Sequence, residues 1–248
     1  MEKPGKVSTG GCERPTWVLV ALGDSTPTGY GLDSELSYVY IYASYLEEDL
    51  NVDVVVYNWA TNNTRTVSDW VHEVQNNKDL RRDLQDANVV ILWMGWHNVI
   101  PCIMEEGDSG PIFIENPDTM CLQRAIHPMR EAFDKLLLEI SSHTRNQALI
   151  LIADVGVPPL FVKKWKKLGS FNLWYKQAYE VWRRYIEQAA RKYDVHVVPT
   201  HKVVNDPLKG YMLATEYVQS DGLHFNKLGH KLIADIHRKI GYEHVEPM

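Results

Sequence analysis

Two short segments near opposite ends of the chain hold residue types that together can perform nucleophilic catalysis. Ser25 follows the apolar run Trp17–Leu22, in a turn too rich in glycine to continue that run. Asp221 and His224 lie three residues apart across a glycine-containing turn. A serine hydroxyl needs a base to remove its proton, and a carboxylate can hold an imidazole in the tautomer that does so. The residues predict a hydrolytic triad, with Ser25 as nucleophile, His224 as base and Asp221 as the orienting acid.

Each segment also has a plainer interpretation. Gly23, Asp24 and Ser25 are ordinary turn residues, so that triplet by itself is weak evidence for catalysis. Asp221 can equally cap a turn, and His224 can be a surface residue before a helix. The catalytic hypothesis depends on the two segments meeting in space.

The pattern of apolar residues predicts the strands and helices that must bring the serine and histidine segments together. Continuous apolar runs of this length are typical of strands buried on both faces of a parallel sheet. Five such runs occur, at Trp17–Leu22, Asp53–Asn58, Asn88–Met94, Ala148–Ala153 and Val195–Pro199. Longer segments whose apolar residues have helical spacing follow these runs. They are Ser37–Leu50, Thr66–Gln75 with a continuation toward Leu84, Arg124–Ser142, Phe171–Tyr193 and Asn226–Ile240. This alternation predicts a doubly wound α/β fold, a parallel sheet of about five strands covered by helices on both faces.

The sequence predicts one domain over residues 1–248, because it shows no internal repeat and no linker. Its irregular part is an insertion at 101–121, which follows the third strand at the edge where ligands bind in such sheets. Residues 1–15 are polar and contain glycine, so we expect a flexible segment that lacks the apolar core of a signal peptide. A cytoplasmic protein and a trimmed secreted form both fit.

Composition narrows the classes of function. The chain has 45% hydrophobic and 23% charged residues, typical of a soluble globular protein, and its net charge of −6 disfavours nucleic acid as a partner. No apolar run reaches the roughly 18 residues of a membrane span. Of three cysteines, Cys102 and Cys121 flank the insertion and either form a disulfide or remain free thiols. The sequence does not define the oligomeric state.

Three blocks of the sequence resemble the SGNH, or GDSL, hydrolase superfamily. They are Gly23–Gly31, Met94–Asn98 and Asp221–His230, in the family's order and spread over most of the chain. The resemblance implies a flavodoxin-like three-layer α/β/α sandwich and the triad Ser25, Asp221 and His224. It also implies an oxyanion hole with three donors: the Ser25 backbone N–H, a glycine N–H after the second strand and an asparagine side chain after the third.

The chain departs from the family pattern at the last two donors. An ungapped match places Asn63 on the glycine, and its backbone N–H or its amide can still donate. After the third strand the match places His97 on the asparagine, while a shift of one residue makes Asn98 the donor. We favour Asn98, because its amide donates in every protonation state, and keep His97 as the alternative.

Other chemistry-bearing residues have weaker interpretations. Trp59 and Trp96 lie beside the predicted oxyanion donors and either wall an acyl or sugar pocket or belong to the core. Asp154, at the end of the fourth strand, either caps the turn before Gly156, the interpretation we favour, or lines the pocket. His230, His237 and His244 are spaced by seven residues, too far apart for one metal, and are interpreted as a solvated helix face. We expect no metal and no cofactor.

The sequence therefore predicts a serine hydrolase that cleaves a small-molecule carboxylic ester, either a short-chain acyl ester or an O-acetyl compound. A lysophospholipase, a thioesterase or an acyltransferase are alternatives of the same class. A carbohydrate- or lipid-binding protein that has kept the fold and lost turnover is the alternative of another class.

Overall fold

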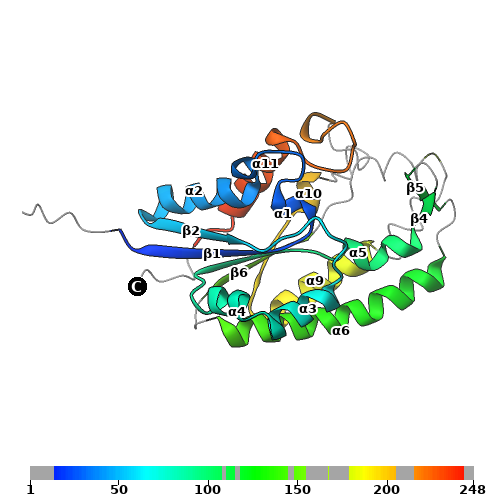
Figure 1. Ribbon diagram of the computed structural model, residues 1–248, viewed down its shortest axis with the longest axis horizontal. Coiled ribbons are helices and arrows are strands. Elements are labelled where there is room, and N and C mark those ends of the chain that lie inside the picture. Colours follow the sequence, from blue (N-terminus) through cyan, green and yellow to red (C-terminus); the bar gives the residue numbers. More distant parts are fainter. Residues whose placement is uncertain are drawn as a thin grey trace, which may run out of the picture.

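The computed structural model describes residues 14–107, 110–114, 118–144, 148–154, 167, 179–204 and 215–242. Residues 1–13, for which we expect flexibility, lie outside this part of the chain, and so do residues 171–178, the first part of the helix predicted at Phe171–Tyr193. Element labels are those of Figure 1.

A five-stranded parallel sheet forms the centre of the molecule, in the strand order β2-β1-β3-β6-β7. Its strands are β1 (Thr16–Gly23), β2 (Asp53–Asn58), β3 (Val89–Trp93), β6 (Leu149–Ala153) and β7 (His196–Val198). All five match the predicted runs. Every residue of β3 and β6 is buried, as expected for strands covered on both faces, whereas the edge strand β2 alternates between exposed and half-buried residues.

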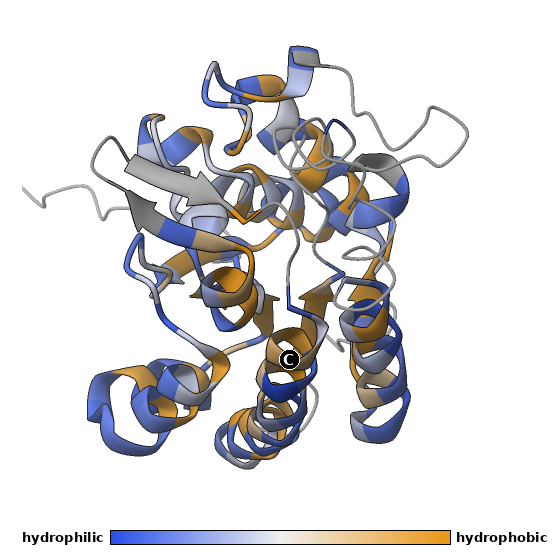
Figure 2. Cartoon of the chain, turned by 90° about the vertical axis from the view of Figure 1, so that its right-hand side faces the viewer, coloured by the Kyte–Doolittle hydropathy of each residue, from blue (hydrophilic) through white to orange (hydrophobic). Residues whose placement is uncertain are grey.

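Helices cover the sheet on both faces, which confirms the predicted three-layer α/β/α architecture. Figure 1 shows α2 (Tyr38–Leu50) and α11 (Lys227–Arg238) on one face. The other face carries α3 (Val67–Asn76), α4 (Lys78–Gln85), α6 (Thr119–His143) and α9 (Glu180–Tyr193). Alternate residues of β1 enter the two cores: Leu19 packs with α2 and α11, and Val20 packs with the other layer. The helices turn hydrophobic residues to the sheet and hydrophilic residues outward (Figure 2).

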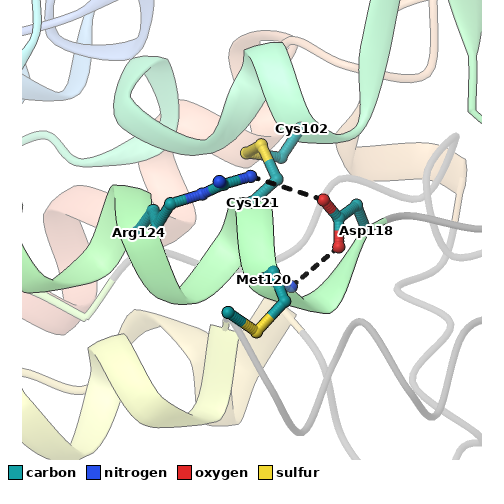
Figure 3. The surroundings of a disulfide bond; sticks show 5 residues. All are labelled: Cys102, Asp118, Met120, Cys121 and Arg124. Atoms are coloured by element: carbon teal, nitrogen blue, oxygen red, sulfur yellow. Dashed lines mark hydrogen bonds and ion pairs between the residues drawn. A yellow bond between two sulfur atoms is a disulfide. The ribbon is translucent and has the colours of Figure 1, made fainter.

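Two helix boundaries differ from the prediction, and capping side chains explain both. The helix expected to run from Thr66 toward Leu84 is two helices, because the Asn77 side chain accepts hydrogen bonds from the N–H groups of Asp79 and Leu80 and begins α4. Helix α6 begins at Thr119, five residues before its predicted start, because Asp118 accepts a bond from the Met120 N–H (Figure 3).

The segment after β3 is more ordered than the predicted irregular insertion at 101–121. It contains the helical turn η2 (Ile100–Cys102) and an antiparallel hairpin, β4 (Met104–Gly107) with β5 (Gly110–Phe113). These short strands pair with each other and not with the main sheet. The alternation of sheet strands and covering helices in the sequence therefore did not indicate them. A Cys102–Cys121 disulfide, with Cα atoms 5.6 Å apart, joins η2 to the start of α6 (Figure 3).

The interpretation of the α11 histidines as a solvated face is wrong. His230 and His237 are almost fully buried, and burial lowers the pKa of each to about 4. Seven residues are about two helical turns, so both rings share one face, and that face packs against Tyr38 and Tyr42 of α2. The Tyr38 N–H donates to Nδ1 of His230 at 3.1 Å. His244 lies outside the described residues.

Candidate active site

The turn after β1 places Ser25 at the first position of a single-turn helix, α1 (Ser25–Thr28), at the carboxyl edge of the sheet. Gly23 has φ +152°, and a Cβ atom there would lie 2.2 Å from the Trp93 carbonyl oxygen, so the turn requires glycine. The buried Asp24 caps the helix by accepting the Thr26 N–H at 3.1 Å. Burial raises the pKa of Asp24 to about 7.

The loop before α11 fixes the orientation of His224. One carboxylate oxygen of Asp221 accepts the backbone N–H groups of Leu223 and His224, at 2.8 and 3.1 Å. The other lies 2.7 Å from Nδ1 of His224. Burial alone would raise the pKa of Asp221, but the hydrogen bonds from His224 and the backbone lower it below the usual value.

The structure brings the three predicted residues together. Nε2 of His224 lies 3.0 Å from Oγ of Ser25, a residue 199 positions away in the sequence. Carboxylate, imidazole and hydroxyl thus form one hydrogen-bonded chain, the arrangement in which an imidazole can take a serine proton.

Two residues that the sequence analysis missed link the serine and histidine loops. The Tyr30 ring lies over the His224 ring, with centroids 4.2 Å apart, and remains 45% exposed. The Gln219 amide donates to the carbonyl oxygens of Tyr30 and Phe225, at 2.6 and 2.9 Å. Next to Tyr30, Gly31 has φ +78° and lies so close to Gln219 that a Cβ atom would be 2.5 Å from its side chain. The signal available in the sequence was the glycine on each side of Tyr30.

The loop after β2 brings a different asparagine to the serine helix from the one predicted. The backbone N–H of Asn63 already donates to Oγ1 of Thr61 at 3.2 Å, and Asn63 is exposed. Asn62 instead accepts a bond from Thr28 of α1 at 2.7 Å. Asn63 would have to release its bond before this N–H could hold a substrate oxygen.

The two alternative donors after β3 lie together in α5 (Trp96–Val99). Oδ1 of Asn98 accepts the Val67 N–H at the start of α3 at 3.1 Å, which fixes the amide so that its NH₂ end points away from that contact. His97 has a buried Nδ1 with no hydrogen-bond partner among the described residues, and burial lowers its pKa. Both side chains are therefore neutral donors near pH 7.

The two candidate pocket tryptophans are half-buried and contact different helices. The indole N–H of Trp59 donates to the buried Asp83 of α4 at 3.0 Å, so its polar edge faces that helix. The ring of Trp96 stacks against Tyr179, with centroids 6.4 Å apart.

Within the described part of the chain, no three histidine, cysteine, aspartate or glutamate side chains are grouped so that they could hold a metal ion. None of the helices described is both long and apolar enough to cross a bilayer.

A central parallel sheet between two helical layers, with Ser25 in the turn after β1 at the carboxyl edge, is the three-layer α/β/α architecture that the sequence predicts. The family model for GDSL-like lipase/acylhydrolase matches residues 19–236. The chain belongs to that family. No curated protein matches the chain at a significant level.

Solved structures share the fold at low sequence identity. The lipase Lip_vut3 from a goat rumen metagenome is 19% identical, with a TM-score of 0.68 over 93% of this chain and 100% of that one. A variant of Axe2, an acetyl xylan esterase from Geobacillus stearothermophilus, is 17% identical, with a TM-score of 0.62 over 95% and 99%. The esterase EstA from Pseudoalteromonas sp. is 15% identical, with a TM-score of 0.56 over 90% and 94%.

Proposed function

We propose that this protein is a serine hydrolase that cleaves carboxylic esters through an acyl-enzyme intermediate. Membership of the GDSL-like family supports ester hydrolysis in general. The observation that carries the serine mechanism is the hydrogen-bonded chain from Asp221 through His224 to Ser25.

In the first step, Oγ of Ser25 attacks the ester carbonyl carbon while Nε2 of His224 takes the hydroxyl proton. Asp221 stabilises the imidazolium that forms and holds its Nδ1–H. The tetrahedral intermediate expels the alkoxide, which receives the proton from Nε2, and the acyl group stays on Ser25. Water then attacks the acyl carbon, His224 takes its proton and returns it to Oγ, and the carboxylic acid leaves.

The oxyanion that develops in both steps needs fixed donors. The Ser25 N–H stands at the first position of α1, where backbone N–H groups have no acceptor within the helix. We assign the Asn98 amide as the second donor, because its contact with Val67 orients the NH₂ group. His97 remains the alternative, and Asn63 is the weakest of the three proposed donors because its N–H is already bonded.

The substrate class we favour is a short-chain acyl ester or an O-acetyl compound, with Trp96 and Trp59 as pocket residues. The lipase and the acetyl xylan esterase among the structures of similar fold are consistent with this class. Lysophospholipase, thioesterase and acyltransferase activities use the same chemistry and stay as alternatives. A non-catalytic carbohydrate- or lipid-binding protein is the alternative that the test below separates.

The test is hydrolysis of p-nitrophenyl esters from acetate to palmitate. Ser25→Ala and His224→Ala should each lower kcat by roughly four to six powers of ten, with an unchanged circular dichroism spectrum. Ser44→Ala is the matched control, since this exposed hydroxyl donates to the Ile41 carbonyl oxygen of its own helix and bonds to no other described residue. Wild-type activity in either triad variant would refute the mechanism, and no turnover of any ester by the native chain would favour the binding protein.

A further inference from the structure

A second aspartate–histidine pair lies at the carboxyl edge of the sheet, apart from the triad. Asp154 directly follows β6, and His201 lies in α10 (Thr200–Val204), which follows β7. Asp154 is 1% exposed, and the side chain of His201 is 12% exposed. One carboxylate oxygen accepts the His201 backbone N–H at 3.0 Å and the Thr200 hydroxyl at 3.2 Å. The other bonds to Nδ1 of the His201 ring.

This pair repeats the bonding of Asp221 and His224. In both pairs, one carboxylate oxygen holds the backbone N–H of the histidine and the other holds ring Nδ1. Such a carboxylate keeps the proton on Nδ1 and leaves Nε2 as an acceptor. The backbone bond alone would cap the turn, so the ring contact is an additional feature. No described residue forms a hydrogen bond with Nε2 of His201.

The sheet order sets the distance between the two pairs. One strand, β3, separates β1 from β6, and β7 lies one strand further. With neighbouring strands about 4.8 Å apart, Asp154 and His201 lie roughly 10 to 14 Å along the edge from the end of β1. His201 is therefore too far from Ser25 to act on the same carbonyl. It is within reach of a substrate that extends along this edge, which faces the viewer in Figure 2.

We propose that Nε2 of His201 accepts a hydrogen bond from a hydroxyl group on the alcohol part of the ester, forming a remote subsite for a polyhydroxylated leaving group. This inference rests on the proposed function, because it takes the scissile bond to lie at Ser25. A hydroxyl donor suits an imidazole acceptor held by a buried carboxylate. A phosphate would be repelled by the carboxylate of Asp154. An acyl chain would displace water from the polar pair and offer no hydrogen bonds in its place.

Two substrates of different length test the subsite. p-Nitrophenyl acetate has a single-ring leaving group that ends short of His201, whereas a mono-O-acetylated disaccharide extends along the edge. In His201→Phe, KM for the disaccharide ester should rise roughly tenfold, the effect of one lost hydrogen bond. His201→Gln should recover part of this loss, because its amide oxygen can accept. For p-nitrophenyl acetate, kcat/KM should stay within about twofold in both variants. Equal losses on both substrates, or no loss on either, would overturn the proposal.

A binding measurement separates failure of the subsite from failure of the hydrolase. Calorimetry with Ser25→Ala and the intact acetylated disaccharide should show binding that weakens roughly tenfold when His201→Phe is added. If the native chain hydrolyses no ester but this loss appears, the proposed function and the leaving-group assignment fail, while the hydroxyl-binding site at His201 stands. If Ser25→Ala binds the disaccharide no better with His201 than without it, the subsite fails whatever the activity. Asp154→Asn combined with His201→Phe keeps the test open if His201→Phe alone does not fold, since it leaves no buried carboxylate unpaired.

Discussion

Removal of the Cys102–Cys121 disulfide should cost the protein about 3 kcal/mol of folding free energy. The bond closes a segment with a sequence separation of 19. A cross-link of this span removes about 11 cal/mol/K of entropy from the unfolded chain, or about 3 kcal/mol at 25 °C. For a chain of this size, such a loss lowers Tm by about 6 to 12 °C. The double variant Cys102→Ala, Cys121→Ala is the perturbation of choice, because it leaves no unpaired thiol at the buried Cys102.

The same variant should affect catalysis through α5. The turn η2 follows α5 directly, so the bond to α6 restrains the segment that presents His97 and Asn98. Donors to an oxyanion act in the transition state, and loosening them lowers kcat more than it raises KM. We therefore expect kcat on p-nitrophenyl acetate to fall severalfold with KM nearly unchanged.

Thermal melting with and without a reductant is the assay. Wild-type protein in reductant should melt at the temperature of the double variant, and the variant should not respond to reductant. Cys12→Ala should melt as wild type does in both conditions, and in this background the denatured protein should show thiols only after reduction. Two thiols without reductant would show that the bond is absent, and a formed bond with an unchanged Tm would refute the entropy argument.

Three further predictions concern the site and the core. Asp221→Asn should lower kcat by roughly 10⁴-fold in the p-nitrophenyl acetate assay with little change in KM, because an amide that donates to Nδ1 leaves His224 in the wrong tautomer. Tyr30→Leu should lower kcat roughly threefold to tenfold in the same assay by removing the ring over His224, while Tyr30→Phe should match wild type. The pKa of His237 falls from an ordinary value near 6.5 to about 4, so between these pH values the unfolded chain binds more protons. The contribution of His237 to the free energy of unfolding should therefore fall by about 3 kcal/mol as the pH drops from 7 to 4, and urea titrations should show a smaller pH slope in His237→Gln, in which the equally shifted His230 is still present.

The sheet was predictable because its central strands are buried on both faces. Residues such as Leu92 and Ile152 belong to unbroken apolar runs of strand length, which are typical of strands buried on both faces. The histidines of α11 show the limit of the same reasoning. A spacing of seven residues indicates that His230 and His237 share one face of α11. This face is buried because α2, a helix distant in the sequence, packs against it.

The residues at the carboxyl edge differ in the same way: some carry a local signal in the sequence, and others meet only through the packing of distant segments. The proximity of Ser25, Asp221 and His224 was predictable because each segment carries a recognisable local pattern and the two segments match blocks of one family, while their catalytic role stays a prediction. Asp154 and His201 carry no such signal. They are 47 residues apart and meet only because β6 and β7 are neighbours in the sheet, an adjacency that the spacing of the residues does not contain.

The 3.0 Å hydrogen bond between Ser25 and His224 depends on how firmly the histidine loop is held. Asn226 caps α11 by accepting the N–H groups of Leu228 and Gly229, and its own amide donates back to the carbonyl oxygen of Glu216. The Gln219 amide ties the same loop to the serine turn. These contacts join three stretches of the loop before any substrate binds, so under the proposed mechanism the imidazole does not have to be ordered during the reaction. They hold His224 beside Ser25 through the loop's own side chains, without using the residues that we propose as oxyanion donors.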